Sequence, residues 1–183
     1  METTAVNIPN LLSISRILTV PLFIILMLEP TPFRALIAAI IFSLASATDW
    51  LDGYLARRWG QVTKIGKLLD PIADKILVTS ALIMLVDINK DVHSWIAIVI
   101  IGREFAVTGL RAIASSDGIV IPAETTGKYK TGAQIIAVIS LVLNYHLETI
   151  WMSELGIIAL WIAMLLGVYS AVQYFARYWK KLN

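Results

Sequence analysis

The chain contains no cysteine and only two histidines, at positions 93 and 146. Without cysteine there can be no disulfide bond and no thiolate metal site. Charge is also scarce, because charged residues make up 15% of the 183 residues, whereas an average soluble domain has about 25%. Apolar residues reach 58%, and mean hydropathy is +0.77. This composition predicts an integral membrane protein.

The N-terminus lacks the basic start and the small-residue cleavage site of a secretory signal peptide, so we expect no segment to be removed. The chain shows no internal repeat and no low-complexity linker. Residues 1–183 are therefore predicted to form a single membrane domain.

Six apolar stretches are long enough to cross a hydrocarbon core of about 30 Å. A charged loop around 57–67 is expected to join the second stretch to the third, and a loop over 115–130 the fourth to the fifth. The sequence thus predicts an all-α integral membrane protein, a six-transmembrane-helix bundle. The stretches fall at roughly 11–28, 33–52, 69–86, 92–113, 132–147 and 154–176.

Basic residues gather on one side of this predicted bundle. If both termini face the cytoplasm, all of the 15 lysines and arginines except Arg34 and Lys90 belong to the cytoplasmic half. This is the bias that the positive-inside rule describes. We therefore expect both termini to be cytoplasmic, in a multi-pass protein of a bacterial-type inner membrane.

Two pairs of aspartates lie at the ends of neighbouring apolar stretches, Asp49 with Asp52 and Asp70 with Asp74. Residues three or four positions apart share one face of a helix, so each pair points one way. If the two helices pack as a hairpin, the four carboxylates converge. An all-oxygen site favours a hard divalent cation such as Mg²⁺ or Mn²⁺. The alternative, plain ion pairing, would need four cations nearby and is disfavoured at bilayer depth.

These aspartates belong to a longer pattern over residues 49–74, D-x-x-D-G-x-x-A-R-x8-G-x3-D-x3-D. The pattern resembles the signature of the CDP-alcohol phosphotransferase family and departs from it nowhere. The resemblance implies a six-helix membrane fold, commonly homodimeric. It also implies transfer of a phosphatidyl or phosphoalcohol group from a CDP-linked donor to an acceptor hydroxyl, with release of CMP.

The resemblance assigns the four aspartates to one or two divalent ions that neutralise the donor's pyrophosphate. Asp74 would complete the metal shell or act as general base on the acceptor hydroxyl, and the sequence leaves both roles open. Its neighbour Lys75 we interpret as a snorkelling lysine at the interface.

A nucleotide site is implied by the same motif. Gly53, Ala56 and Gly66 would leave room for the nucleotide beside the backbone, although close helix packing explains small residues equally well. Arg57 offers a planar guanidinium for phosphate oxygens. The implied CDP-binding set is Asp52, Gly53, Ala56, Arg57, Gly66 and Asp70.

A second group of cations, within about 103–134, concerns the acceptor. Arg103 and Arg111 lie two turns apart on one predicted helix, about 80° around its axis, and Lys128 and Lys130 precede the next. Four cations beside an anionic site suggest an acceptor that itself carries a phosphate. The simpler interpretations are that Arg103 pairs with Glu104 and that the lysines follow the positive-inside rule or touch anionic head groups.

Arg103-Glu104, residues 127–131 and Gln134 look like the phosphatidylglycerophosphate synthase branch of the family. That branch implies CDP-diacylglycerol as donor and sn-glycerol 3-phosphate as acceptor. The N-terminal segment carries the same resemblance and would support the donor site, although part of it could simply cap the first helix. Its residues are Asn7, Pro9, Asn10 and Arg16.

Three rival functions stay open. Another family member, a cardiolipin, phosphatidylserine or phosphatidylinositol-phosphate synthase, would share the motif and differ in its acceptor. An ion or proton transporter is disfavoured because the carboxylates cluster at one face instead of lining a path. A membrane sensor of nucleotide or metal would bind without turnover. Besides its substrates we expect membrane lipids as partners and no nucleic acid.

Overall fold

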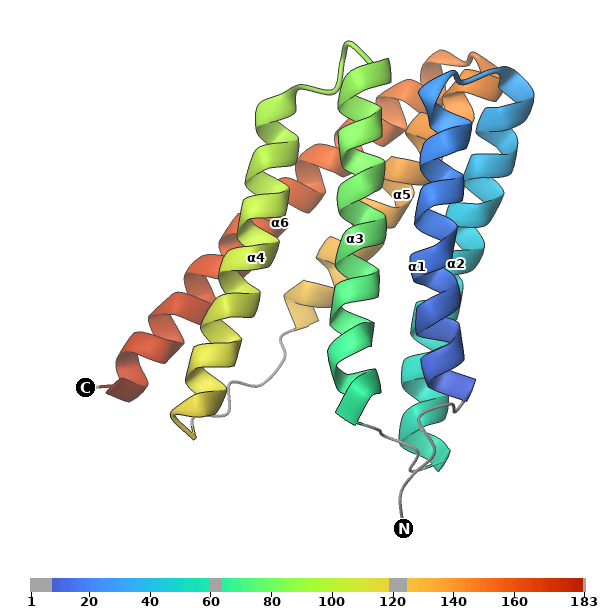
Figure 1. Ribbon diagram of the computed structural model, residues 1–183. Helices are drawn as coiled ribbons and strands as arrows, with labels where there is room; N and C mark the ends of the chain where they lie inside the picture. Colours follow the sequence, from blue (N-terminus) through green and yellow to red (C-terminus); the bar gives the residue numbers. More distant parts are fainter. Residues whose placement is uncertain (1–7, 60–63, 119–124, 183) are drawn as a thin grey trace.

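The structure, a computed structural model, describes residues 8–59, 64–118 and 125–182. Within these ranges the regular structure consists of six α-helices and no strand, so the predicted all-α class is confirmed. Figure 1 shows them as one bundle. The helices are α1 (Ile8–Leu28), α2 (Pro32–Trp59), α3 (Lys64–Ile88), α4 (Ser94–Ser116), α5 (Thr125–Leu147) and α6 (Ile150–Leu182).

Several helices extend beyond the apolar stretches that predicted them. Helix α2 continues to Trp59, and α3 already begins at Lys64, so the expected charged loop over 57–67 is wrong for most of its length. The expected loop over 115–130 is also too long, because α4 continues to Ser116 and α5 begins at Thr125. Apolar runs mark the buried part of a helix, whereas backbone hydrogen bonding carries the helix on into polar sequence.

The helix boundaries themselves have local causes. Pro32 occupies the first turn of α2, where its missing N–H costs nothing, and the Thr31 hydroxyl accepts a hydrogen bond from the backbone N–H of Arg34. After α4, Gly118 adopts a left-handed conformation with φ +72°, and its N–H donates to the Ser115 carbonyl. This is the usual glycine termination of a helix.

Apolar packing in the main core joins buried side chains from all six described helices, most of them from α1, α2, α3 and α5. Phe23 and Phe42 lie with ring centroids 5.9 Å apart and are both fully buried. The buried positions of α2 are mostly alanines, which allow neighbouring helices to approach closely. Gly156 of α6 has the same effect, since a Cβ added there would lie 2.5 Å from Cγ of Leu141. We call this set of buried residues the aliphatic core.

Helices α4 and α6 also pack against each other. Trp95 and Trp161 meet edge to face with centroids 5.3 Å apart. Further along, a small apolar cluster includes Leu110 and Tyr174. Figure 1 shows the two helices running together, with α6 passing obliquely behind α4. Helix α6 packs most extensively along α5, whereas α4 meets α6 and, in a smaller contact, α3.

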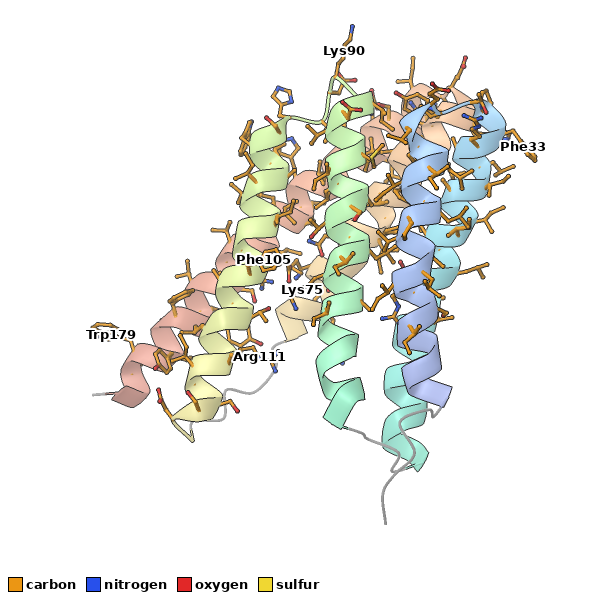
Figure 2. All side chains as sticks on the ribbon, in the orientation of Figure 1. Phe33, Lys75, Lys90, Phe105, Arg111 and Trp179 are labelled. Atoms are coloured by element: carbon orange, nitrogen blue, oxygen red, sulfur yellow. The ribbon has the colours of Figure 1, made fainter. Side chains whose placement is uncertain are left out.

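Helix α1 begins and α6 ends at the same end of the bundle, as Figure 1 shows. Lys90 and Phe33 lie at the opposite end (Figure 2). Among the described helices only α6 is by itself long and apolar enough to cross a membrane, over Ile150–Lys180, where the most apolar stretch of 18 residues has a mean hydropathy of 2.3. Shorter apolar helical segments occupy Ile14–Leu28 and Pro32–Thr48.

Candidate functional site

The signature motif occupies the facing ends of α2 and α3. Asp49 and Asp52 lie in the last turns of α2, and Asp70 and Asp74 lie in the first half of α3. Their side chains are outside the described residues, so the predicted convergence of the carboxylates stays a prediction. Among the side chains that the structure does describe, no group of three or more acidic or histidine residues could hold a metal ion.

The residues of the predicted CDP-binding set lie on the same two helix segments. Gly53, Ala56 and Arg57 belong to α2 and Gly66 to α3, again without described side chains. At the N-terminus, Asn7 is outside the described residues, and only the backbone is described for Pro9 and Asn10, in the first turn of α1.

Arg16, the fourth residue of the predicted N-terminal support, is well described. Its side chain is almost completely buried, with an exposed fraction of 1%. A guanidinium at such a position is not a side chain that reaches out to the interface, because burial of a charge is expensive unless the surroundings compensate it. Nothing in the local sequence indicates this burial.

A cluster of three charged side chains lies where α4, α5 and α6 meet. Glu104 accepts a hydrogen bond from Nη1 of Arg103 at 3.0 Å and another from Nζ of Lys130, both at its Oε1. The exposed side-chain fractions are 9% for Arg103, 20% for Glu104 and 7% for Lys130. We call these residues the Glu104 cluster. One carboxylate therefore links two cations from different helices in a sheltered position.

Arg103 also links α4 to α6 through two hydrogen bonds. Its Nε donates to the carbonyl of Gly167 at 2.7 Å, and its Nη2 donates to Oγ of Ser170 at 2.9 Å. A Cβ at Gly167 would lie 3.6 Å from Cδ of Arg103 and 3.6 Å from Cδ of Lys130, an ordinary van der Waals distance, so the two long side chains pack directly beside this glycine. The pairing with Glu104 that the sequence suggested is therefore present. The contacts with α6 were missed, because the partners lie more than 60 residues away in the chain.

A small cavity adjoins the Glu104 cluster on the side of α3. Its volume is about 20 Å³, enough for one water molecule or one hydroxyl group. Lys75 reaches it from α3, which gives this lysine a place beside Glu104 that the sequence did not suggest; Figure 2 shows Lys75 in the middle of the bundle. The lining residues are Lys75, Val78, Thr79, Leu82, Ile100, Ile101, Glu104, Lys130, Thr131 and Gln134.

Gln134 is the most unusual member of the cavity wall. Only 3% of its surface is exposed, and within the described part of the chain its Nε2 has no hydrogen-bond partner. Leaving a buried donor unsatisfied costs about 1–3 kcal/mol. A polar atom that entered the cavity could accept a hydrogen bond from this amide and satisfy its donor.

The remaining two predicted cations are not part of the Glu104 cluster. Arg111 is exposed on α4, and Figure 2 places it toward the end of the bundle where α6 terminates. Lys128 is exposed on α5, two residues from Lys130 and therefore on a different face of the helix. The structure thus brings Arg103 and Lys130 together and leaves Arg111 and Lys128 accessible to solutes.

Comparison with known proteins finds a family model and several relatives that match most of the chain. A family model described as CDP-alcohol phosphatidyltransferase matches residues 6–169. The chain is 44% identical to a protein of Bacillus subtilis (strain 168) over 192 residues, with 97% of each chain covered. It is 41% identical to one of Pseudomonas fluorescens, covering 97% of this chain and 92% of the relative.

A third relative, from Rickettsia bellii (strain RML369-C), is 40% identical over 170 residues and covers 92% of this chain and 93% of its own. All three relatives carry the name CDP-diacylglycerol--glycerol-3-phosphate 3-phosphatidyltransferase. The matches thus extend over the motif helices, the Glu104 cluster and the cavity.

Proposed function

Because the chain belongs to the CDP-alcohol phosphatidyltransferase family, we propose that it transfers the phosphatidyl group of CDP-diacylglycerol to sn-glycerol 3-phosphate. The products are phosphatidylglycerophosphate and CMP. The observation that carries the proposal is the shared name of relatives that match over more than nine-tenths of their length. A complete signature motif at the facing ends of α2 and α3 supports it.

The aspartates of the motif fit a divalent cation, Mg²⁺ or Mn²⁺, in one or two copies. Asp49, Asp52, Asp70 and Asp74 supply oxygen ligands only, which is the donor set such ions prefer. Their spacing on two consecutive helices allows each pair to act from one helix face. When bound, the metal neutralises the pyrophosphate of the donor and the charge that develops during transfer.

The protein's own groups would then perform the proton and phosphate chemistry. The acceptor hydroxyl oxygen forms a bond to the phosphorus that carries diacylglycerol, and the bond from that phosphorus to the oxygen of CMP breaks. The hydroxyl proton passes to the carboxylate of Asp74, if Asp74 is the general base and not a further metal ligand. Arg57 would bind the leaving phosphate, while Gly53, Ala56 and Gly66 would give the nucleotide access to the backbone.

For the acceptor phosphate we propose Arg103, Arg111, Lys128 and Lys130. Lys130 lines the cavity, and Arg111 and Lys128 are exposed on the neighbouring helices α4 and α5. Arg103 already donates three hydrogen bonds to protein groups. Its contribution would therefore include holding Glu104 and α6 in place, and a substitution there would disturb packing as well as binding.

The proposed activity requires a membrane setting. We propose that all six helices cross the bilayer of a bacterial-type inner membrane, with both termini and the active site cytoplasmic, and that the protein is a homodimer. The start of α1 and the end of α6 at one end of the bundle support this topology (Figure 1). Large apolar side chains exposed on the outer faces, such as Leu18 and Leu165, are consistent with contact with lipid.

Release of CMP by the purified protein in detergent tests the function. CDP-diacylglycerol and Mg²⁺ would be offered with sn-glycerol 3-phosphate, glycerol, serine, inositol phosphate or phosphatidylglycerol as acceptors. Release that depends on glycerol 3-phosphate supports the proposal. Release with another acceptor would make the protein a different member of the family. No release with any acceptor, from protein that is folded, would leave a transporter or a sensor as the better explanation.

A further inference from the structure

Gln134 lies one turn after Lys130 on α5, at the wall of the small cavity beside Glu104. We propose that Gln134 is a specificity-determining residue, whose side-chain amide donates a hydrogen bond to the acceptor hydroxyl that does not react. The inference rests on the proposed function and adds to it the group that distinguishes a glycerol phosphate from other phosphorylated alcohols.

The first support is the state of the amide itself. The side chain is 97% buried, since its exposed fraction is 3%, and its Nε2 has no partner within the described residues. Nearly all buried donors in folded proteins are paired. A donor that the protein leaves open at a cavity wall is therefore suited to a ligand atom.

The second support is the distance between binding groups. Residues four apart on a helix have Cβ atoms about 5–6 Å from one another, so Lys130 and Gln134 present a cation and an amide on one face of α5. Glu104 fixes the lysine by accepting its hydrogen bond. A short phosphorylated polyol can bridge such a pair, with its phosphate toward the lysine and a hydroxyl toward the amide.

The third support is size. The cavity of about 20 Å³ accommodates one hydroxyl group or one water molecule. Glycerol 3-phosphate carries two hydroxyls, of which the terminal one reacts and the middle one is retained. The middle hydroxyl is thus the group that Gln134 would recognise. An ordered water on Gln134 is the competing explanation, and it predicts no dependence on the acceptor's structure.

The test compares glycerol 3-phosphate with 3-hydroxypropyl phosphate, which lacks only the middle hydroxyl, in the full-length protein and in Gln134→Met. Methionine has a similar length and no donor. The wild type should prefer glycerol 3-phosphate by about tenfold or more in kcat/KM, the factor expected for one hydrogen bond of about 1.4 kcal/mol. Gln134→Met should lose most of this preference by slowing glycerol 3-phosphate alone.

Asn144→Leu is the matched control, because Asn144 also carries a buried side-chain atom without a partner in the described structure, near the opposite end of α5. It should keep the wild-type preference. If Gln134→Met does not fold, Gln134→Asn, which keeps the amide and shortens it, should show a reduced preference. An unchanged preference in the folded variant, or an equal loss on both acceptors, would overturn the assignment. A wild-type protein without activity on glycerol 3-phosphate would overturn the proposed function, and this assignment with it.

Discussion

The aliphatic core and the Glu104 cluster lie in the same bundle and are built on opposite principles. The core consists of apolar side chains such as Phe23, Leu85 and Val138, which are fully buried and pack in one hydrophobic cluster. The Glu104 cluster, between α4, α5 and α6, consists of two cations around one carboxylate beside a cavity. Packing alone explains the first region.

The second region requires another explanation. Sheltered charges cost free energy, and they are retained in membrane helices mainly where they bind or transport something. The comparison therefore makes the Glu104 cluster a candidate binding region in addition to the motif on α2 and α3. Variants in the core should change stability without changing substrate preference, whereas variants near the cluster should change both or only the latter.

The largest effect is expected outside both regions, at the motif. Asp74→Asn removes the carboxylate that would take the acceptor's proton, and a lost general base lowers rates by about 10²–10⁴-fold. We expect CMP release to fall by about three orders of magnitude while the unfolding temperature in detergent stays close to that of the wild type. Asp91→Asn, at an exposed aspartate between α3 and α4, is the control and should remain fully active.

Glu104→Leu tests the Glu104 cluster directly. It removes the carboxylate shared by Arg103 and Lys130, and loss of one partner from a buried ion pair costs about 3–5 kcal/mol. Thermal unfolding should show a clearly lower midpoint, and activity should fall with it. Glu29→Gln, which affects the exposed pair of Glu29 and Arg34 at 3.8 Å, should leave the midpoint unchanged. Equal midpoints for the two variants would show that the Glu104 cluster is energetically unimportant.

Gly156→Ala tests the packing of the core, where α6 contacts Leu141 of α5. The added Cβ would lie 2.5 Å from Cγ of Leu141 and 3.2 Å from its backbone nitrogen, so α5 and α6 must shift. Overpacking of this kind costs about 1–3 kcal/mol. The unfolding midpoint should fall, while the ratio of kcat/KM values for different acceptors should not move. Gly109→Ala, where a Cβ meets nothing within 4 Å, is the control and should keep or slightly raise the midpoint, because alanine favours a helix interior over glycine. A changed acceptor ratio in Gly156→Ala would count against the separation of the two regions.

The smallest effect is expected at the exposed cations. Lys128→Gln should raise KM for glycerol 3-phosphate by about two- to fivefold with little change in kcat, because an exposed cation attracts an anionic substrate through a screened field. The effect should disappear at high salt. Lys90→Gln, at the other end of the bundle (Figure 2), should leave KM unchanged. Equal effects of the two substitutions on KM would contradict a role of Lys128 in binding the acceptor.

The lengths and breaks of the apolar stretches were sufficient to predict the six helices in the described part of the chain and their order, because charge or proline separates each stretch from the next. The apolar stretches did not predict where the helices end, since α2 continues through Arg57 to Trp59 in polar sequence. The contact of Arg103 with Gly167 and Ser170 was likewise unpredictable from one sequence. Nothing local to either segment identifies a partner so far along the chain.

Gln134 and Lys75 illustrate a related limit. Both are ordinary polar residues of helices in the sequence, and only the packing of α3 against α4 and α5 brings them to one cavity. The motif shows the reverse case. Its spacing predicts a metal site and its resemblance to the family implies a nucleotide site, whereas the side chains that would form them lie outside the described residues. Convergence of the four aspartates therefore remains a prediction for the variants above to test.

Identification of the lipid product tests the central claim most directly. The purified protein, reconstituted in liposomes with CDP-diacylglycerol, Mg²⁺ and sn-glycerol 3-phosphate, would be analysed by mass spectrometry of the extracted lipids. We predict a new lipid that carries two phosphates on a glycerol-linked head group, formed in equal amount with CMP and absent when glycerol 3-phosphate is omitted. CMP formed together with phosphatidic acid, or a head group derived from another acceptor, would contradict the proposed transfer.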